Sequence, residues 1–153
     1  MPQIGETAPD FTLPVTGGGE VSLADLKGQP VVLFFYPRDD TSGCTKENQD
    51  FSRLAPEFEA AGAKVYGISK DSIASHDKFM AKKELTVPLL SDEDSDMAER
   101  YGVYGEKKMY GKTFMGITRA TFLIDAEGKI AQTWPKVKVP GHAEEVLDAV
   151  KAL

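Results

Sequence analysis

The amino-acid sequence predicts an α/β fold in which a mixed central sheet carries helices on both of its faces. Strand and helix patterns alternate through the first two thirds of the 153 residues, and two strand patterns and a last helix pattern follow them. No internal repeat, low-complexity tract or linker rich in proline, glycine or serine divides the chain. We therefore expect a single domain over residues 1–153.

The first half of the chain supplies the predicted centre of the sheet. A hairpin is expected within residues 10–23, where three consecutive glycines make the turn. Residues 31–36 (VVLFFY) form a continuous apolar run, which is typical of a central strand covered on both faces. A helix is expected over residues 45–62, and Pro56 should break or kink it. A second buried strand follows over residues 63–69.

The second half predicts three helices, over residues 72–85, 94–102 and 142–153. It also predicts three short strands, over residues 87–90, 119–124 and 130–134. The segment GEKKMYGKT resembles a phosphate-binding loop, but five residues separate its glycines where that loop requires four. We expect a solvated loop there, and we expect Phe114 and Met115 after it to fill the core rather than to wall a site.

Composition excludes several classes of function. The net charge of −6 and the scattered lysines argue against nucleic acid as a partner. No apolar run approaches the roughly 20 residues that cross a bilayer, so we expect no membrane partner. The start MPQIGETAPDF lacks the basic and apolar regions of a secretory signal, and we expect a cytoplasmic protein.

The chain has one cysteine, Cys44, which cannot form an internal disulfide, a CxxC pair or a cysteine-rich zinc site. It follows a predicted strand and stands at the expected start of a helix, where backbone N–H groups or a nearby arginine would favour the thiolate. Asp39 and Asp40 oppose this unless they face away or are neutralised. From its position alone, an inert buried thiol and a reactive nucleophile both remain open, and the polar loop PRDDTSG favours the nucleophile.

The spacing Pro37-xxx-Thr41-xx-Cys44 resembles the active-site signature of the peroxiredoxins, which are thiol peroxidases on a thioredoxin-like fold. The segment GEKKMYGKTFMGITRATFLIDAEGKI is similar to the segment that carries that family's active-site arginine, which matches Arg119. The similarity runs from APDFTLP through VVLFFYP to TFLIDAEGKI. It is closest to the branch known as bacterioferritin comigratory protein or peroxiredoxin Q, and it implies a thioredoxin-like (peroxiredoxin) fold.

The resemblance also implies a role for each of these residues. Cys44 would attack the O–O bond of hydrogen peroxide or an organic hydroperoxide and become a sulfenic acid. Pro37 would shield the sulfur, and Thr41 would place its hydroxyl against the peroxide and the thiolate. Arg119 would favour the thiolate and stabilise the charge that develops as the O–O bond breaks. No metal, haem or flavin is expected.

The sequence departs from the branch at its second cysteine. Many members carry a resolving cysteine in a pattern like CTxExC, but this chain has CTKENQ, with Gln49 at that place. The next predicted helix, where other members place the resolving thiol, has none either. We expect a monomer with a one-cysteine mechanism that depends on an external thiol, such as thioredoxin, glutaredoxin or glutathione. Alternatively, two Cys44 thiols could pair between chains.

Three further hypotheses remain beside this interpretation. A non-catalytic peroxide sensor or thioredoxin-like interaction module would use the same thiol stoichiometrically, and only turnover separates it from an enzyme. His76 is a weaker candidate, as a base for Cys44 in a thiol hydrolase, because no partner that would orient it is evident. Glu47 is expected to complement the helix N-terminus rather than to perform acid–base chemistry.

Overall fold

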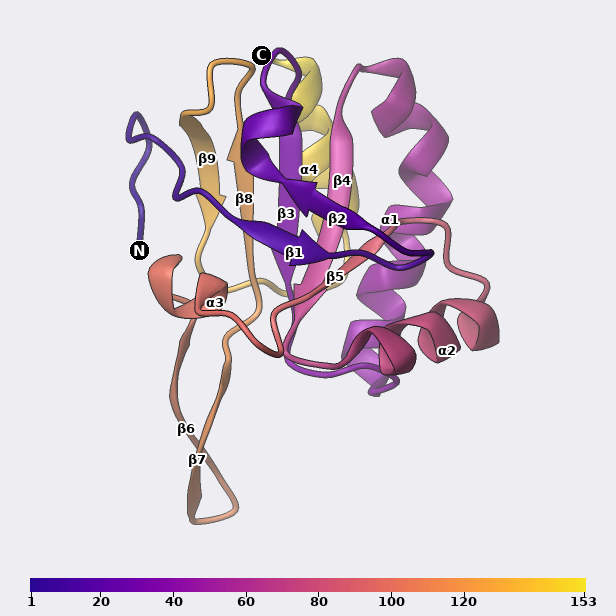
Figure 1. The fold of residues 1–153 in the computed structure, drawn as a ribbon, viewed down its shortest axis with the longest axis vertical. Helices are drawn as coiled ribbons and strands as arrows, with labels where there is room; N and C mark the ends of the chain where they lie inside the picture. Colours follow the sequence, from indigo (N-terminus) through magenta and orange to yellow (C-terminus); the bar gives the residue numbers. More distant parts are fainter.

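The computed structural model describes all residues, 1–153, around a five-stranded sheet of order β5–β4–β3–β8–β9 (Figure 1). Three neighbouring strands are parallel: β3 (Val31–Phe35), β4 (Lys64–Ser69) and β5 (Leu89–Ser91). On the other side of β3, β8 (Ala120–Ile124) runs antiparallel to it, and β9 (Ile130–Trp134) runs antiparallel to β8. The sheet is therefore mixed, as the sequence predicts.

The central strand β3 explains why the apolar run is unbroken. Side chains alternate between the two faces of a strand, and both faces of β3 are covered. Val31, Leu33 and Phe35 belong to the apolar cluster on one face. Val32 and Phe34, with Tyr36 just beyond the strand, belong to the cluster on the other face.

Different elements cover the two faces of the sheet. One face packs against α1 (Ser42–Ala60) and α4 (His142–Lys151), and α2 (Ile73–Lys83) adds Phe79 to the same cluster. The opposite face is covered by the N-terminal hairpin and two short helices, as Figure 1 shows with β1 and β2 in front of the sheet and α4 behind it. These elements are β1 (Thr12–Pro14), β2 (Glu20–Ser22), the 3-10 helix η1 (Leu23–Leu26) and α3 (Met97–Arg100). None of the helices combines the length and the apolar character needed to cross a bilayer.

Of the break or kink predicted at Pro56, the break is wrong, because α1 continues through this residue. Proline has no N–H to donate to the carbonyl of Ser52, four residues earlier. The hydroxyl of Thr86 donates to that carbonyl instead, at 3.3 Å. The backbone N–H of Thr86 also donates to Ser52 Oγ, at 3.0 Å, so a tertiary contact replaces the missing helical bond.

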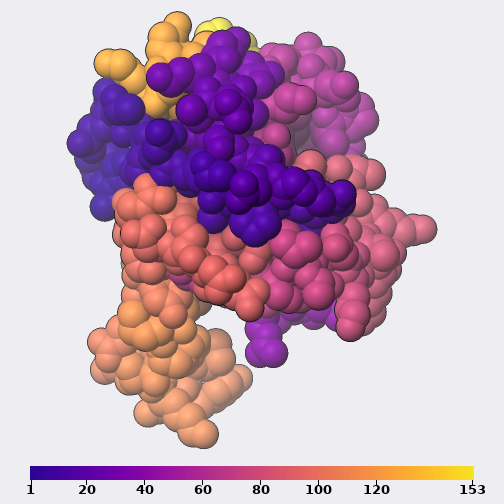
Figure 2. All heavy atoms as spheres, viewed as in Figure 1, coloured from indigo at the N-terminus to yellow at the C-terminus, as the bar shows by residue number.

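The segment expected to be a solvated loop forms a second hairpin, which corrects that prediction. Strands β6 (Tyr104–Met109) and β7 (Lys112–Ile117) pair along their whole length and project from the body of the protein (Figures 1 and 2). The turn has positive φ at Tyr110 (53°) and Gly111 (75°), as a two-residue type I′ turn requires. Phe114 and Met115 lie on this hairpin with 42% and 57% of their surface exposed, so the prediction that they fill the core is also wrong.

Candidate active site

Cys44 is the third residue of α1, directly after the loop that leaves β3. Its side chain is 1% exposed and packs in the apolar cluster between the sheet and α1. Burial alone would fit an inert thiol. What separates Cys44 from an inert thiol is a single polar contact, made by an arginine from a distant part of the chain.

Arg119 donates a hydrogen bond from Nη2 to the Cys44 sulfur at 3.3 Å. The sheet register explains the meeting: Ala120, the first residue of β8, pairs with Phe35, the last residue of β3, so Arg119 just before β8 lies beside the loop that follows β3. A Cβ atom on Gly43 would lie 3.2 Å from Arg119 Nη2, so the glycine before Cys44 gives the guanidinium its room. The arginine identified from the sequence therefore does reach the thiol.

Glu47 binds the other side of the same guanidinium, with Arg119 Nη1 at 2.7 Å from its Oε1. It is three residues after Cys44, so both side chains lie on one face of α1. Helix α1 begins at Ser42, which leaves Glu47 outside the first turn. The prediction that Glu47 complements the helix N-terminus is therefore wrong: its carboxylate is the ion-pair partner of Arg119.

Burial dominates the electrostatics of this pair. It raises the pKa of Glu47 to about 7, although Arg119 acts in the opposite direction. Burial also works to lower the pKa of Arg119, but Glu47 and Cys44 outweigh it and the pKa ends above its ordinary value. The guanidinium therefore stays charged beside the Cys44 sulfur.

Thr41 and Pro37 lie on the loop between β3 and α1. Thr41 occupies the N-cap position of α1, but its side chain accepts no hydrogen bond from the helix, and its hydroxyl donates to the carbonyl of Arg38 at 2.9 Å rather than to Cys44. With its proton used in this way, Thr41 Oγ1 can still accept a hydrogen bond from a ligand. Pro37 is the second residue after β3 and is half-buried. Both residues therefore lie between the end of β3 and the start of the helix that carries Cys44.

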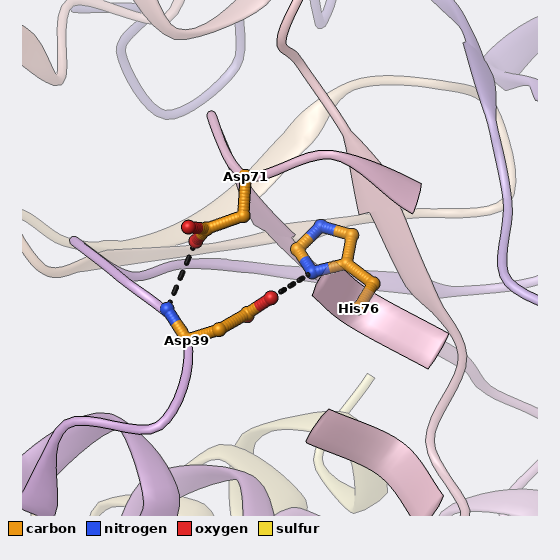
Figure 3. Close-up of side chains that lie close together, drawn as sticks. All are labelled: Asp39, Asp71 and His76. Carbon is orange, nitrogen blue, oxygen red and sulfur yellow. Dashed lines mark hydrogen bonds and ion pairs between the residues drawn. The ribbon is translucent and has the colours of Figure 1, made fainter. Parts of the chain in front are cut away.

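The two aspartates of the loop form contacts with α2 and not with the thiol. Asp40 forms ion pairs with Lys82 at 2.7 Å and Lys83 at 3.7 Å, both on α2. Asp39 faces α2 as well, and its Oδ2 lies 2.7 Å from His76 Nδ1 (Figure 3). His76 therefore does have an orienting partner, which is Asp39, and the imidazole faces this carboxylate rather than Cys44.

Asp39, Asp71 and His76 form the one group of side chains with the spacing of a metal site, with their ligand atoms within 4.8 Å of one another (Figure 3). These atoms are already engaged. Asp71 Oδ2 accepts from the backbone N–H of Asp39 and from the hydroxyl of Ser69, at 2.9 and 2.6 Å. Asp39 Oδ2 accepts from Ser75 at 2.8 Å. A cation would have to displace these donors, so the group is a hydrogen-bonded cluster.

Comparison with known proteins places this geometry in a family. The model of the AhpC/TSA family matches residues 4–133. The chain belongs to this family. It is 51% identical over 145 residues to a putative peroxiredoxin Bcp of Coxiella burnetii, which covers 95% of this chain and 96% of that protein.

Solved structures refine the assignment. The crystal structure of a cysteine mutant of Xylella fastidiosa PrxQ is 43% identical, with a TM-score of 0.93, and covers 99% of this chain and 97% of that one. The Xanthomonas campestris bacterioferritin comigratory protein is 45% identical, with a TM-score of 0.89, over 99% and 97% of the two chains. The chain is thus a peroxiredoxin of the Bcp/PrxQ branch, a thiol peroxidase with a thioredoxin-like fold, and Cys44 is its single cysteine. The comparisons confirm the family and fold expected from the sequence.

The sequence motif identified Cys44 and Arg119, but not the residues that surround them. Glu47 was visible as an acidic residue one turn after the cysteine, yet nothing in the sequence links it to Arg119, 72 positions away. Asn48 is another residue that the motif does not predict, and its Nδ2 donates to the carbonyl of Cys44 at 2.9 Å. Its spacing of four residues from Cys44 is the one signal that pointed to this contact.

Proposed function

We propose that this peroxiredoxin reduces hydrogen peroxide and small organic hydroperoxides through a one-cysteine cycle, with Cys44 as the peroxidatic nucleophile and an external thiol as the resolving group. The observation that carries the proposal is the 3.3 Å contact between Arg119 and the chain's single thiol. The Xanthomonas campestris relative has an alkyl peroxide reduction activity, which supports the inclusion of organic hydroperoxides.

In the first step, the Cys44 thiolate attacks one oxygen of the peroxide. The S–O bond forms as the O–O bond breaks, and the electron pair leaves with the second oxygen, which takes up a proton and departs as water or an alcohol. Sulfur is oxidised to the sulfenic acid and the peroxide is reduced. Negative charge develops on the leaving oxygen, where a fixed guanidinium stabilises it better than mobile water does.

Three residues assist this step in the proposed cycle. The Arg119 guanidinium stays in position beside the sulfur because Glu47 binds it from the other side. Thr41 accepts a hydrogen bond from the peroxide O–H, since its own proton is directed to the Arg38 carbonyl. Pro37 shields the sulfur from water at the start of the loop.

In the second step, an external thiol attacks the sulfenic sulfur, forms a mixed disulfide and releases water. A second thiol then attacks that disulfide and regenerates Cys44. Gln49 is exposed and offers no thiol, so the electrons must come from outside the chain. Thioredoxin, glutaredoxin and glutathione are the candidates in the cytoplasm, where we place this protein as a monomer. Pairing of Cys44 between two chains is the alternative.

A coupled peroxidase assay tests the proposal, with glutathione and glutaredoxin in one arm and thioredoxin with its reductase in the other. We expect repeated turnover in at least one arm and none for Cys44→Ser, whose unfolding midpoint serves as the control for an intact fold. Turnover in the serine variant would refute the role of Cys44. Consumption of a single equivalent in both arms would indicate a stoichiometric sensor instead.

A further inference from the structure

Asp39 lies midway along the loop that carries Pro37 and Thr41, two residues from each. Its carboxylate receives three hydrogen bonds from the protein. Tyr36 Oη donates to Oδ1 at 2.6 Å, Ser75 Oγ donates to Oδ2 at 2.8 Å, and His76 Nδ1 lies 2.7 Å from Oδ2. The backbone N–H of the same residue is held by Asp71. The centre of the active-site loop is therefore fastened through one side chain and one amide.

His76 connects that side chain to the rigid sheet. It is fully buried, and its Nε2 lies 2.9 Å from the carbonyl oxygen of Leu90 in β5. A carbonyl and a carboxylate can only accept, so each of these two hydrogen bonds needs a proton on the ring nitrogen that makes it. The imidazole thus spans the gap between the central sheet and the loop, as Figure 3 shows for the end that meets Asp39.

Little else holds the loop from this side. The loop and α2 border a cleft of about 530 Å³, which is lined mostly by polar and charged side chains. Asp40 has a left-handed backbone (φ 60°), which is a strained conformation for a residue other than glycine. Its partner Lys82 is largely exposed, with 61% of the side chain accessible. Exposed ion pairs contribute little to stability, so the buried hydrogen bonds to Asp39, rather than the ion pair of Asp40, set the position of the loop.

We propose that His76 is a positioning residue of the peroxidase reaction, which acts through Asp39 to hold Pro37 and Thr41 in place above Cys44. This inference rests on the function proposed above. His76 touches neither the thiol nor the peroxide in this role. It fixes the geometry in which the peroxide meets the thiolate, and reactions between positioned groups lose rate steeply when that geometry loosens.

Two amide substitutions separate the two bonds of His76. The amide nitrogen of asparagine can occupy the place of Nδ1, and that of glutamine the place of Nε2. His76→Asn should therefore keep the bond to Asp39 and lose the one to Leu90, whereas His76→Gln should keep the bond to Leu90 and lose the one to Asp39. Both replace a buried ring by a smaller amide, which makes each the matched control of the other for stability.

Two rates are then measured on each reduced variant: oxidation of Cys44 by hydrogen peroxide in a single turnover, and its alkylation by iodoacetamide. Alkylation needs the thiolate but not Pro37 or Thr41. We expect His76→Gln to lose at least about tenfold in the peroxide rate, the scale of a misplaced reactant. Its alkylation rate should be unchanged or faster, and His76→Asn, which keeps the bond to Asp39, should lose less of the peroxide rate than His76→Gln does.

Equal peroxide rates in the two variants, or parallel loss of both rates in His76→Gln, would overturn the proposal. If the amide variants do not fold, Tyr36→Phe is the alternative, because it removes only the hydroxyl that donates to Asp39 Oδ1. It should lower the peroxide rate without lowering alkylation, and an unchanged peroxide rate would equally overturn the proposal. A parent protein that is alkylated but not oxidised by peroxide would contradict the proposed function itself, which keeps the two failures apart.

Discussion

Replacing Arg119 with alanine removes two contacts at once, the hydrogen bond to Cys44 and the ion pair with Glu47. Breaking a buried pair by removing one partner costs roughly 3–5 kcal/mol, because the other charge is left buried and unpaired. Glu47 is 1% exposed, so it meets that condition, while the Arg119 side chain is 18% exposed. Glu47, with a pKa of about 7, can also take up a proton. We therefore expect a loss at the lower end, about 3 kcal/mol in the free energy of unfolding.

The same substitution should lower the rate of Cys44 oxidation by about 10²–10³, the usual effect of removing one donor aimed at developing charge. Adding Glu47→Gln to Arg119→Ala separates the two effects, because the amide leaves no stranded carboxylate. The double variant should recover most of the lost stability and none of the lost rate. Urea unfolding measures the first quantity, and single-turnover oxidation by hydrogen peroxide measures the second.

Two results would refute this reasoning. If the double variant is no more stable than Arg119→Ala, a stranded Glu47 carboxylate is not what destabilises the single variant. If the double variant recovers the peroxide rate, Arg119 acts on the fold and not on the reacting atoms. Glu47→Gln alone is the control: it keeps an oxygen to accept from Arg119 Nη1, so it should retain most of the activity.

Three further predictions follow from named contacts. The pKa of Glu47 is raised from 4.5 to about 7, so between these pH values the folded chain retains a proton that the unfolded chain loses. The free energy of unfolding should therefore fall by at most roughly 3 kcal/mol as the pH rises from 4.5 to 7. Urea titrations should find this pH dependence absent in Glu47→Gln. A Cβ on Gly67 would lie 2.7 Å from Leu89 Cδ2, so Gly67→Ala should cost about 1–3 kcal/mol in the same measurement. Gln49→Cys should form an internal disulfide with Cys44 only if the first turns of α1 unwind, since a helical spacing of five positions puts the two residues about 7.5 Å apart along the axis. Peptide mapping after peroxide treatment detects the bond, and its formation at the rate of Cys44 oxidation would show that no unwinding step limits it.

The central sheet was predictable because its signal is local. Buried parallel strands read as continuous apolar runs, and residues 31–36 have one that fills both clusters of the core. The reactive loop was predictable from the polar PRDDTSG before Cys44, together with the resemblance of its spacing to a known signature. Each of these features lies within a few consecutive residues.

The remaining features depend on contacts that the sequence does not display. Glu47 meets Arg119 across 72 positions, and Asp39 meets His76 across 37. The hairpin β6–β7 was missed because Tyr110 occupies a turn position with positive φ, where asparagine, aspartate or glycine is the usual signal. Local patterns give the elements, but the register of β8 on β3 decides which side chains share the site.

The most direct test of the central claim is the intact mass of the reduced protein after one equivalent of hydrogen peroxide, followed by glutathione. A sulfenic acid on Cys44 that waits for an external thiol predicts a gain of one oxygen atom, then a mixed disulfide with glutathione, then the original mass when glutathione is in excess. A disulfide-linked pair of chains formed before glutathione is added would contradict the account, because Cys44 would then be resolved by its own counterpart. An unchanged mass after peroxide would contradict it at the first step.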